Sequence, residues 1–234
     1  MIYKKIYSFT LAITGVLVFF VLPWMNELIS PFIPSLAISF IEFFSAYGFF
    51  RLFTNFMLKT IDRSSVLKRM FFSSSYFEGM WVGYYVVPVD KKHVIFFKKI
   101  EQSVEKINLV VHAYHVNDGS FRGKWKNNGG IFIDHEEMEL SYLYDFSAVN
   151  SFDTGKSNPN SSGTFVANYF RQGLFKSPHR LVGIASNFVT QDKFQVEMKK
   201  VYNVKEDDIE QLKKAAREFY ISQVGANENG GVLD

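Results

Sequence analysis

The sequence has no cysteine, six prolines and a formal net charge of only +3 among its 234 residues. Without cysteine there can be no disulfides and no thiolate metal sites, although this does not decide the compartment. A net charge this small argues against a general nucleic-acid-binding protein. The sequence also lacks a glycine-rich phosphate loop, a G-x-S-x-G elbow and an H-E-x-x-H motif. We therefore predict no catalytic residues, no enzymatic activity and no cofactor.

Metal-ligating residues are sparse as well. His112 and His115 are three residues apart, and in a strand such residues point to opposite faces. The run from Asp134 to Glu137 has the composition of a solvated turn or the start of a strand. We therefore predict no metal site.

Two long apolar stretches occupy the first fifty residues. Ile6 to Met25 is twenty residues without a charge, and Pro31 to Phe50 is equally long and interrupted only by Glu42. Twenty helical residues at 1.5 Å each cross a bilayer core of about 30 Å. A cleaved signal peptide is disfavoured because its apolar run is usually shorter and because a second stretch follows at once. We predict a two-helix transmembrane hairpin over residues 1–60.

Basic residues flank this hairpin on one side only. Lys4 and Lys5 precede the first stretch, five basic residues follow the second between positions 51 and 69, and the bend at 23–31 has none. Because loops rich in Lys and Arg stay in the cytoplasm, we predict that both termini are cytoplasmic.

Three residues of the second stretch are candidates for transmembrane association: Glu42, Ala46 and Gly48. A charge at mid-bilayer is costly. Glu42 therefore either lies neutral against the other helix, makes a polar contact between protomers, or lines a membrane defect when hairpins cluster. Ala46 and Gly48 are small and permit close helix approach, which favours association.

The rest of the chain has the pattern of a water-soluble β-domain. A basic juxtamembrane linker at 61–76 leads into a domain at 77–224, and we predict a disordered tail at 225–234. Turn residues separate about eight strand-like runs, which are 77–87, 93–101, 104–116, 119–126, 131–147, 163–171, 180–190 and 193–201. The polar segment 150–163 is predicted to be mobile or a lid, and 206–223 to be a closing helix.

Two of the runs alternate cleanly between apolar and polar residues. Alternate positions from Met138 to Phe146 are apolar, and so are Phe194, Val196 and Met198. Strands of this length with one wet face predict an antiparallel barrel or a sandwich. We favour the barrel, because eight strands and one helix could then leave no exposed sheet edge.

The pattern F-x-G-x-W occurs twice, at Phe77–Trp81 and at Phe121–Trp125. In a strand its three defined residues share one side, and the glycine leaves room for a neighbouring ring or for a ligand. Packing in a barrel core is the favoured interpretation, and a ligand site is the alternative.

Aromatic and basic side chains of the β-domain could form a ligand pocket. A nucleotide needs flat rings for stacking and cationic donors for its phosphates. Strict alternation places Arg122 and Lys124 opposite Trp125, so that one strand cannot supply both kinds of group. The candidate ligand-binding residues are Trp81, Tyr85, Arg122, Trp125, Tyr142, Tyr144, Tyr169 and Arg171.

The order of parts resembles a known family. A strand F-E-G-M-W-V-G-Y-Y at 77–85 follows a basic exit from the two apolar stretches, and L-S-Y-L-Y at 140–144 and G-T-F-V-A-N-Y-F-R at 163–171 come later. This layout is similar to the transmembrane β-barrel effectors of bacterial CBASS anti-phage systems, the SMODS-associated two-transmembrane, β-strand-rich effectors. The resemblance covers nearly the whole chain.

The resemblance implies a compact, lipocalin-like barrel anchored in the bacterial inner membrane. In that family the barrel binds a cyclic dinucleotide made by a cognate nucleotidyltransferase. Binding then drives formation of a homo-oligomer, membrane disruption and abortive-infection cell death. The alternative is a membrane-tethered, lipocalin-like binding protein for an apolar ligand.

Overall fold

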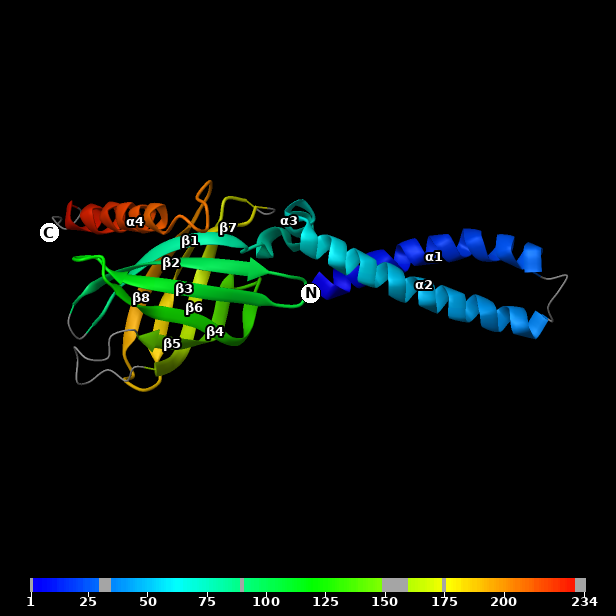
Figure 1. The fold of residues 1–234 in the computed structure, drawn as a ribbon, viewed down its shortest axis with the longest axis horizontal. Coiled ribbons are helices and arrows are strands. Elements are labelled where there is room, and N and C mark those ends of the chain that lie inside the picture. The colour runs from blue at the N-terminus through cyan, green and yellow to red at the C-terminus, as the bar shows by residue number, and fades with distance from the viewer. Residues whose placement is uncertain (1, 30–34, 89–90, 149–159, 174–175, 230–234) are drawn as a thin grey trace. The chain divides into compact units, whose positions relative to one another are not determined.

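The computed structural model describes residues 2–29, 35–88, 91–148, 160–173 and 176–229. The chain divides into two compact units, Met1–Ser73 and Ser74–Asp234. The first unit contains α1 (Ile2–Ile29), α2 (Ser35–Arg63) and α3 (Ser65–Phe72). The second unit contains a short 3-10 turn, eight strands and α4 (Ile209–Asn229) (Figure 1).

The helical unit hides small polar residues and exposes large apolar ones. Helix α1 packs along α2, and the rings of Tyr7 and Phe50 meet edge to face at 5.2 Å. Thr10, Thr14 and Thr54 are buried. Several large apolar side chains are exposed, namely Leu11, Val16, Phe19, Phe20, Leu52 and Phe56. Among the described side chains of this unit, burial therefore does not follow polarity, and Ile61 and Phe72 are buried as well.

Neither the predicted spans nor their association residues are established by the structure. Among the described residues, no helix combines the length and the apolar character needed to cross a membrane. The side chains of Glu42 and Ala46 lie outside the described residues, and an added Cβ on Gly48 would meet no atom within 4 Å. Their role in association therefore stays a prediction.

The second unit is a closed antiparallel barrel. Each strand pairs with the next along the chain, and β1 also pairs with β8, so that no strand edge is left open. The strands are β1 (Gly79–Val86), β2 (His93–Gln102), β3 (Ile107–His115), β4 (Phe121–Asp134), β5 (Glu139–Ala148), β6 (Asn160–Arg171), β7 (Pro178–Asn187) and β8 (Lys193–Val201). This is the up-and-down architecture of lipocalins. The predicted barrel with a C-terminal helix is confirmed, and the sandwich alternative is excluded.

Alternation sorts the side chains into an inner and an outer cluster. Leu140, Tyr142 and Tyr144 point into the barrel with Val196 and Met198, as the period-two pattern predicts. A second cluster lies outside the barrel, where α4 packs against β1 and β2. Its members include Val82, Ile95, Phe97, Leu212 and Phe219. Helix α4 continues to residue 229, beyond the predicted domain boundary at 224.

The turn between β4 and β5 lies later than the sequence suggested. Strand β4 runs through Gly129 and Gly130, and the β4–β5 register shifts between Asn127 and Ile131. Gly129 has φ of 85°, which a glycine adopts without strain. The glycine pair therefore forms a bulge rather than the expected turn. The chain reverses at 135–138 instead, where Asp134 Oδ1 accepts hydrogen bonds from the N–H groups of Glu136 and Glu137.

The predicted loop at 150–163 lies largely outside the described residues, although β6 already begins at Asn160.

Candidate functional site

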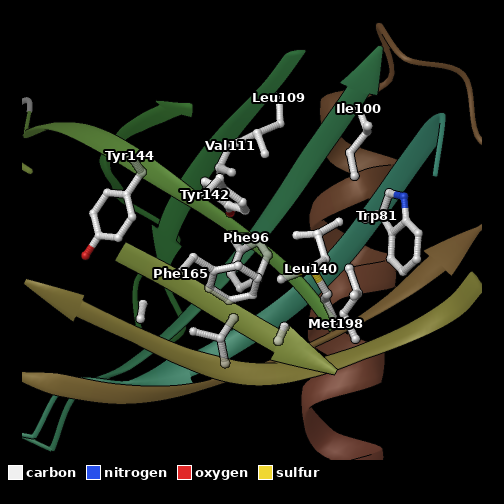
Figure 2. Packing of buried hydrophobic residues seen from close by; sticks show 14 of the residues in the cluster. Trp81, Phe96, Ile100, Leu109, Val111, Leu140, Tyr142, Tyr144, Phe165 and Met198 are labelled. Carbon is white, nitrogen blue, oxygen red and sulfur yellow. The ribbon is translucent and has the colours of Figure 1, made fainter. Parts of the chain in front are cut away.

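Inward-facing side chains from all eight strands fill the barrel. Figure 2 shows part of this inner cluster. A small cavity remains near the middle, with room for about one water molecule. Its walls are almost entirely apolar or aromatic: Phe96, Lys98, Val111, Trp125, Tyr142, Tyr144, Phe165, Ala185, Phe194, Val196 and Met198. A larger ligand can enter this interior only if some of these side chains move.

At one end of the barrel, aromatic rings form what we call the rim cluster: Tyr85, Trp125, Phe146 and Phe194. The ring of Tyr85 lies 5.2 Å from that of Trp125 and 5.3 Å from that of Phe194, and Trp125 lies 5.7 Å from Phe146. Only Tyr85 is fully buried, and the other three are half-buried. The rim cluster is therefore partly exposed to solvent.

Arg122 lies against the rim cluster. Its guanidinium carbon is 5.8 Å from the centre of the Tyr85 ring. Strict alternation would place Arg122 on the face opposite Trp125, but the β3–β4 register shifts between Ala113 and Tyr114. A bulge of this kind re-aims a side chain. The prediction that Arg122 and Trp125 face apart is therefore wrong, and β4 supplies both a cation and a ring at the rim.

The same register shift explains Phe121. Its ring lies outside the barrel, 5.2 Å from Tyr114 and 6.1 Å from His112. It therefore does not share the inner face with Trp125, as the F-x-G-x-W pattern predicted. Gly123, the middle residue of the pattern, does face inward, because an added Cβ would lie 2.6 Å from the Phe146 ring. Here the glycine makes room for a neighbouring ring.

Below the rim, a lysine lies inside the barrel. Lys98 is 0 % exposed, and its Nζ donates to the Tyr142 hydroxyl at 3.4 Å and lies 3.8 Å from Met198 Sδ. The same Nζ is 5.1 Å from the centre of the Tyr142 ring and 5.4 Å from that of Phe165. We call Lys98, Tyr142, Phe165 and Met198 the floor. Among the described residues, no carboxylate forms an ion pair with Lys98.

Burial controls the ionisation of the floor. Removal from water disfavours the ammonium form and lowers the pKa of Lys98 to about 7. Burial also raises the pKa of Tyr142 and of Tyr144, because it disfavours the phenolate. At neutral pH both hydroxyls are therefore protonated donors, and the lysine amine is neutral more readily than an exposed lysine would be.

The other end of the barrel is sealed. Phe77, Trp81 and Tyr169 are completely buried, and the ring of Phe77 lies 5.3 Å from that of Tyr169. Trp81 Nε1 donates to the carbonyl of Phe77 at 2.9 Å. His135 lies between Ser75 Oγ and the Tyr169 hydroxyl, 3.1 Å from each. The segment that leads into β1 therefore closes this end, which we call the sealed end.

Gln102 fastens this segment through two buried hydrogen bonds. Its Oε1 accepts from the Phe77 N–H at 2.8 Å, and its Nε2 donates to the Ser75 carbonyl at 2.8 Å. We expect Gln102→Met to lower the free energy of unfolding by about 2 kcal/mol or more, because two buried backbone groups lose their partners. Urea denaturation of the full-length chain measures this. Glu101→Gln, at an exposed position on the same strand, should change stability by less than about 1 kcal/mol. Equal effects of the two substitutions on the free energy of unfolding would contradict the role of Gln102 in holding this segment.

The eight predicted ligand-binding residues divide between these regions. Tyr85, Arg122 and Trp125 meet at the rim, Tyr142 is on the floor, and Tyr144 lies 6.1 Å from Trp125. Trp81 and Tyr169 instead lie at the sealed end, with Arg171 two residues further along β6. Figure 2 shows Tyr144 and Trp81 at opposite ends of the inner cluster. The structure therefore brings five of the eight together along one half of the barrel.

Sequence reasoning missed Lys98. A signal was present, since Val94, Phe96, Lys98 and Ile100 are alternate residues of one predicted strand. Extending the inner face of that strand through position 98 would have placed a lysine among apolar side chains.

Comparisons with known proteins leave this site without an assigned ligand. No family model matches the chain, and no curated protein matches it. Among solved structures, the chain is similar to one titled "Biogenic amine-binding protein selenomethionine derivative". The two are 15 % identical, the match covers 60 % of this chain and 72 % of that one, and the TM-score is 0.36. A likeness this distant carries no argument about what this barrel binds.

Proposed function

We propose that this chain is a non-enzymatic sensor whose barrel binds a cyclic dinucleotide and whose helical unit is the effector, as in the CBASS effectors that the sequence resembles. One observation carries the proposal: partly exposed rings and a guanidinium meet at the rim. The rings offer faces for the bases, and Arg122 offers paired N–H donors for a phosphate. No resident cofactor or metal is needed for this function.

The rim suits a ligand that binds partly outside the barrel. The cavity beneath it holds about one water molecule, so a whole dinucleotide does not fit inside the closed interior. A base that stacks on Trp125 or Phe194 would leave its phosphate near Arg122. Stacking on an aromatic side chain contributes about 1–3 kcal/mol per base, and a charge-assisted hydrogen bond about 1.5–3 kcal/mol.

The distribution of residues in the helical unit supports a membrane role. Thr10 and Thr14 of α1 and Thr54 of α2 are buried, while Phe19, Phe20 and Leu52 are exposed. Small polar residues between helices and large apolar residues outside are the pattern of helices that pack within lipid. We propose that this unit inserts into the bacterial inner membrane with the barrel in the cytoplasm. Ligand binding promotes its self-association to the extent that the assembled state binds ligand more tightly than the monomer.

Arg122 gives the sharpest test of the ligand class. We expect the full-length chain to bind at least one member of a panel of cyclic di- and trinucleotides by calorimetry. Arg122→Glu should weaken that binding at least about tenfold, because it replaces the phosphate donor with a like charge. Lys124→Glu is the matched control, because Lys124 is an exposed neighbour on the same strand that pairs across with His112. No heat with any cyclic nucleotide, or equal losses in the two variants, would refute the proposal.

The apolar interior favours a second candidate, a lipocalin-like carrier of an apolar ligand. Ten of the eleven residues around the cavity have uncharged side chains, all except Lys98. Mass spectrometry of molecules extracted from the purified chain separates the two functions. A co-purifying lipid or aromatic compound supports the carrier, and a co-purifying cyclic nucleotide supports the sensor.

A further inference from the structure

Lys98 occupies a position where an apolar residue would be expected. It lies on the inner face of β2, where Val94, Phe96 and Ile100 are all buried. Fully buried lysines are rare unless they are paired, because moving an unpaired charge out of water is costly. The Tyr142 hydroxyl and the Met198 sulfur are weak partners for an ammonium group. Packing alone gives no reason for a lysine here.

We infer that Lys98 is an internal anion-binding residue, which pairs with a phosphate or carboxylate group of a ligand that enters past the rim cluster. The inference rests on the proposed function only in placing a ligand in this half of the barrel. Beyond that function, the floor is a second contact with the ligand, and the ligand group that reaches the floor is an anion.

The surroundings of Lys98 suit an anion. The titratable groups around the cavity are Lys98 itself and, from β5, Tyr142 and Tyr144; β2, β3, β4, β6, β7 and β8 contribute only apolar side chains beside them. Among the residues that the structure describes, no carboxylate therefore competes with a ligand at the cavity. Burial keeps the Tyr142 hydroxyl protonated, so the floor offers one ammonium and one hydroxyl as donors. Two donors close together match the oxygen atoms of a phosphate or a carboxylate.

Anion binding at this position should take up a proton. The pKa of Lys98 in the free barrel is about 7, and a nearby anion raises it by favouring the charged form. Above that pH the free barrel holds mainly the neutral amine, so anion binding takes up protons. The affinity should consequently fall by up to about tenfold per pH unit above pH 7. Phosphodiesters and carboxylates do not themselves titrate in this range.

Calorimetry of the full-length chain tests the inference. Titrations at pH 8 in HEPES and in Tris, two buffers of different ionisation enthalpy, give the number of protons taken up. The phosphate probes are cyclic di-AMP and cyclic di-GMP; the carboxylate probe is 2-naphthoate, with 2-naphthalenemethanol as its uncharged control. Lys98→Met should lose both the uptake and at least about tenfold in affinity. Lys98→Arg, which stays charged, should bind without uptake.

The outcomes separate this inference from the proposed function. Proton uptake on binding a cyclic dinucleotide, if it is lost in Lys98→Met, supports both the inference and the proposed function. Uptake with 2-naphthoate but no binding of any cyclic nucleotide supports the inference and removes the proposed function. Arg122-dependent binding of a cyclic dinucleotide without uptake leaves the proposed function standing and overturns the inference. Uptake that persists in Lys98→Met, or the absence of uptake with every charged probe, overturns the inference too.

Discussion

Lys98→Met is expected to make the barrel more stable, by on the order of 3 kcal/mol at pH 7. Burial lowers the pKa of Lys98 from 10.5 to about 7, so the native state holds the charged form at a cost that the unfolded chain does not bear. Methionine has a similar length, fills the same space and has no charge to desolvate. Few single substitutions in a buried core raise stability, which makes this a stringent expectation.

The contribution of Lys98 to the free energy of unfolding should change with pH in one direction. Between about pH 7 and 10.5 the unfolded chain has Lys98 protonated while the native barrel does not, so the unfolded state binds more protons. The stability of the wild-type chain should therefore rise with pH across this window and be lowest at and below pH 7. The advantage of Lys98→Met should be largest at or below pH 7 and should shrink towards pH 10.

Urea denaturation of the full-length chain at several pH values between 6 and 10 measures both effects. Lys99→Met is the control, because the neighbouring side chain points outward and pairs with Glu101 and Glu206. Those carboxylates raise the pKa of Lys99, and the control should gain nothing at pH 7. A Lys98→Met barrel that is less stable than wild type at pH 7 would show that the lysine is structural. If the variant is more stable but loses anion affinity, the lysine is retained for function.

The sequence predicted the barrel best where each strand has one wet face. In β5 and β8 most outward-facing residues are polar, so the inner faces were assigned correctly. Strand β2 is different because α4 covers its outer face, where Ile95 and Phe97 are buried. The run V-I-F-F at 94–97 therefore shows no alternation. The alternate residues Val94, Phe96, Lys98 and Ile100 were therefore not identified as an inner face, and Lys98 was not assigned to the interior.

The candidate site was only partly predictable, because bulges are not visible in a single sequence. The shift near Ala113 and Tyr114 turns Arg122 towards the rim and Phe121 outward. A one-residue change of register reverses every side chain that follows it. Composition identified the aromatic residues, but it did not show that Trp81 and Tyr169 lie at the sealed end and Trp125 at the rim. That division depends on the direction of each strand in the barrel and on how far along its strand each residue lies.

The two tryptophans of the F-x-G-x-W pattern should differ sharply in role. Trp81 is 0 % exposed, stacks on Phe77 and donates a hydrogen bond to its carbonyl. We expect Trp81→Ala to lower the free energy of unfolding by about 3–5 kcal/mol, the usual cost of removing a large buried ring. Trp125 is half-buried, so Trp125→Ala should cost roughly half as much, since less area is lost from the core.

Ligand affinity should show the opposite order. Loss of the Trp125 ring removes a stacking surface at the rim and should weaken cyclic dinucleotide binding by about 1–3 kcal/mol, or roughly 5- to 150-fold. Trp81→Ala should leave the affinity of the folded fraction within about threefold, since Trp81 lies at the sealed end. Urea denaturation and calorimetry on the same preparations measure both quantities. If Trp81→Ala loses affinity while Trp125→Ala does not, ligand enters from the other end, and the rim is not the binding site.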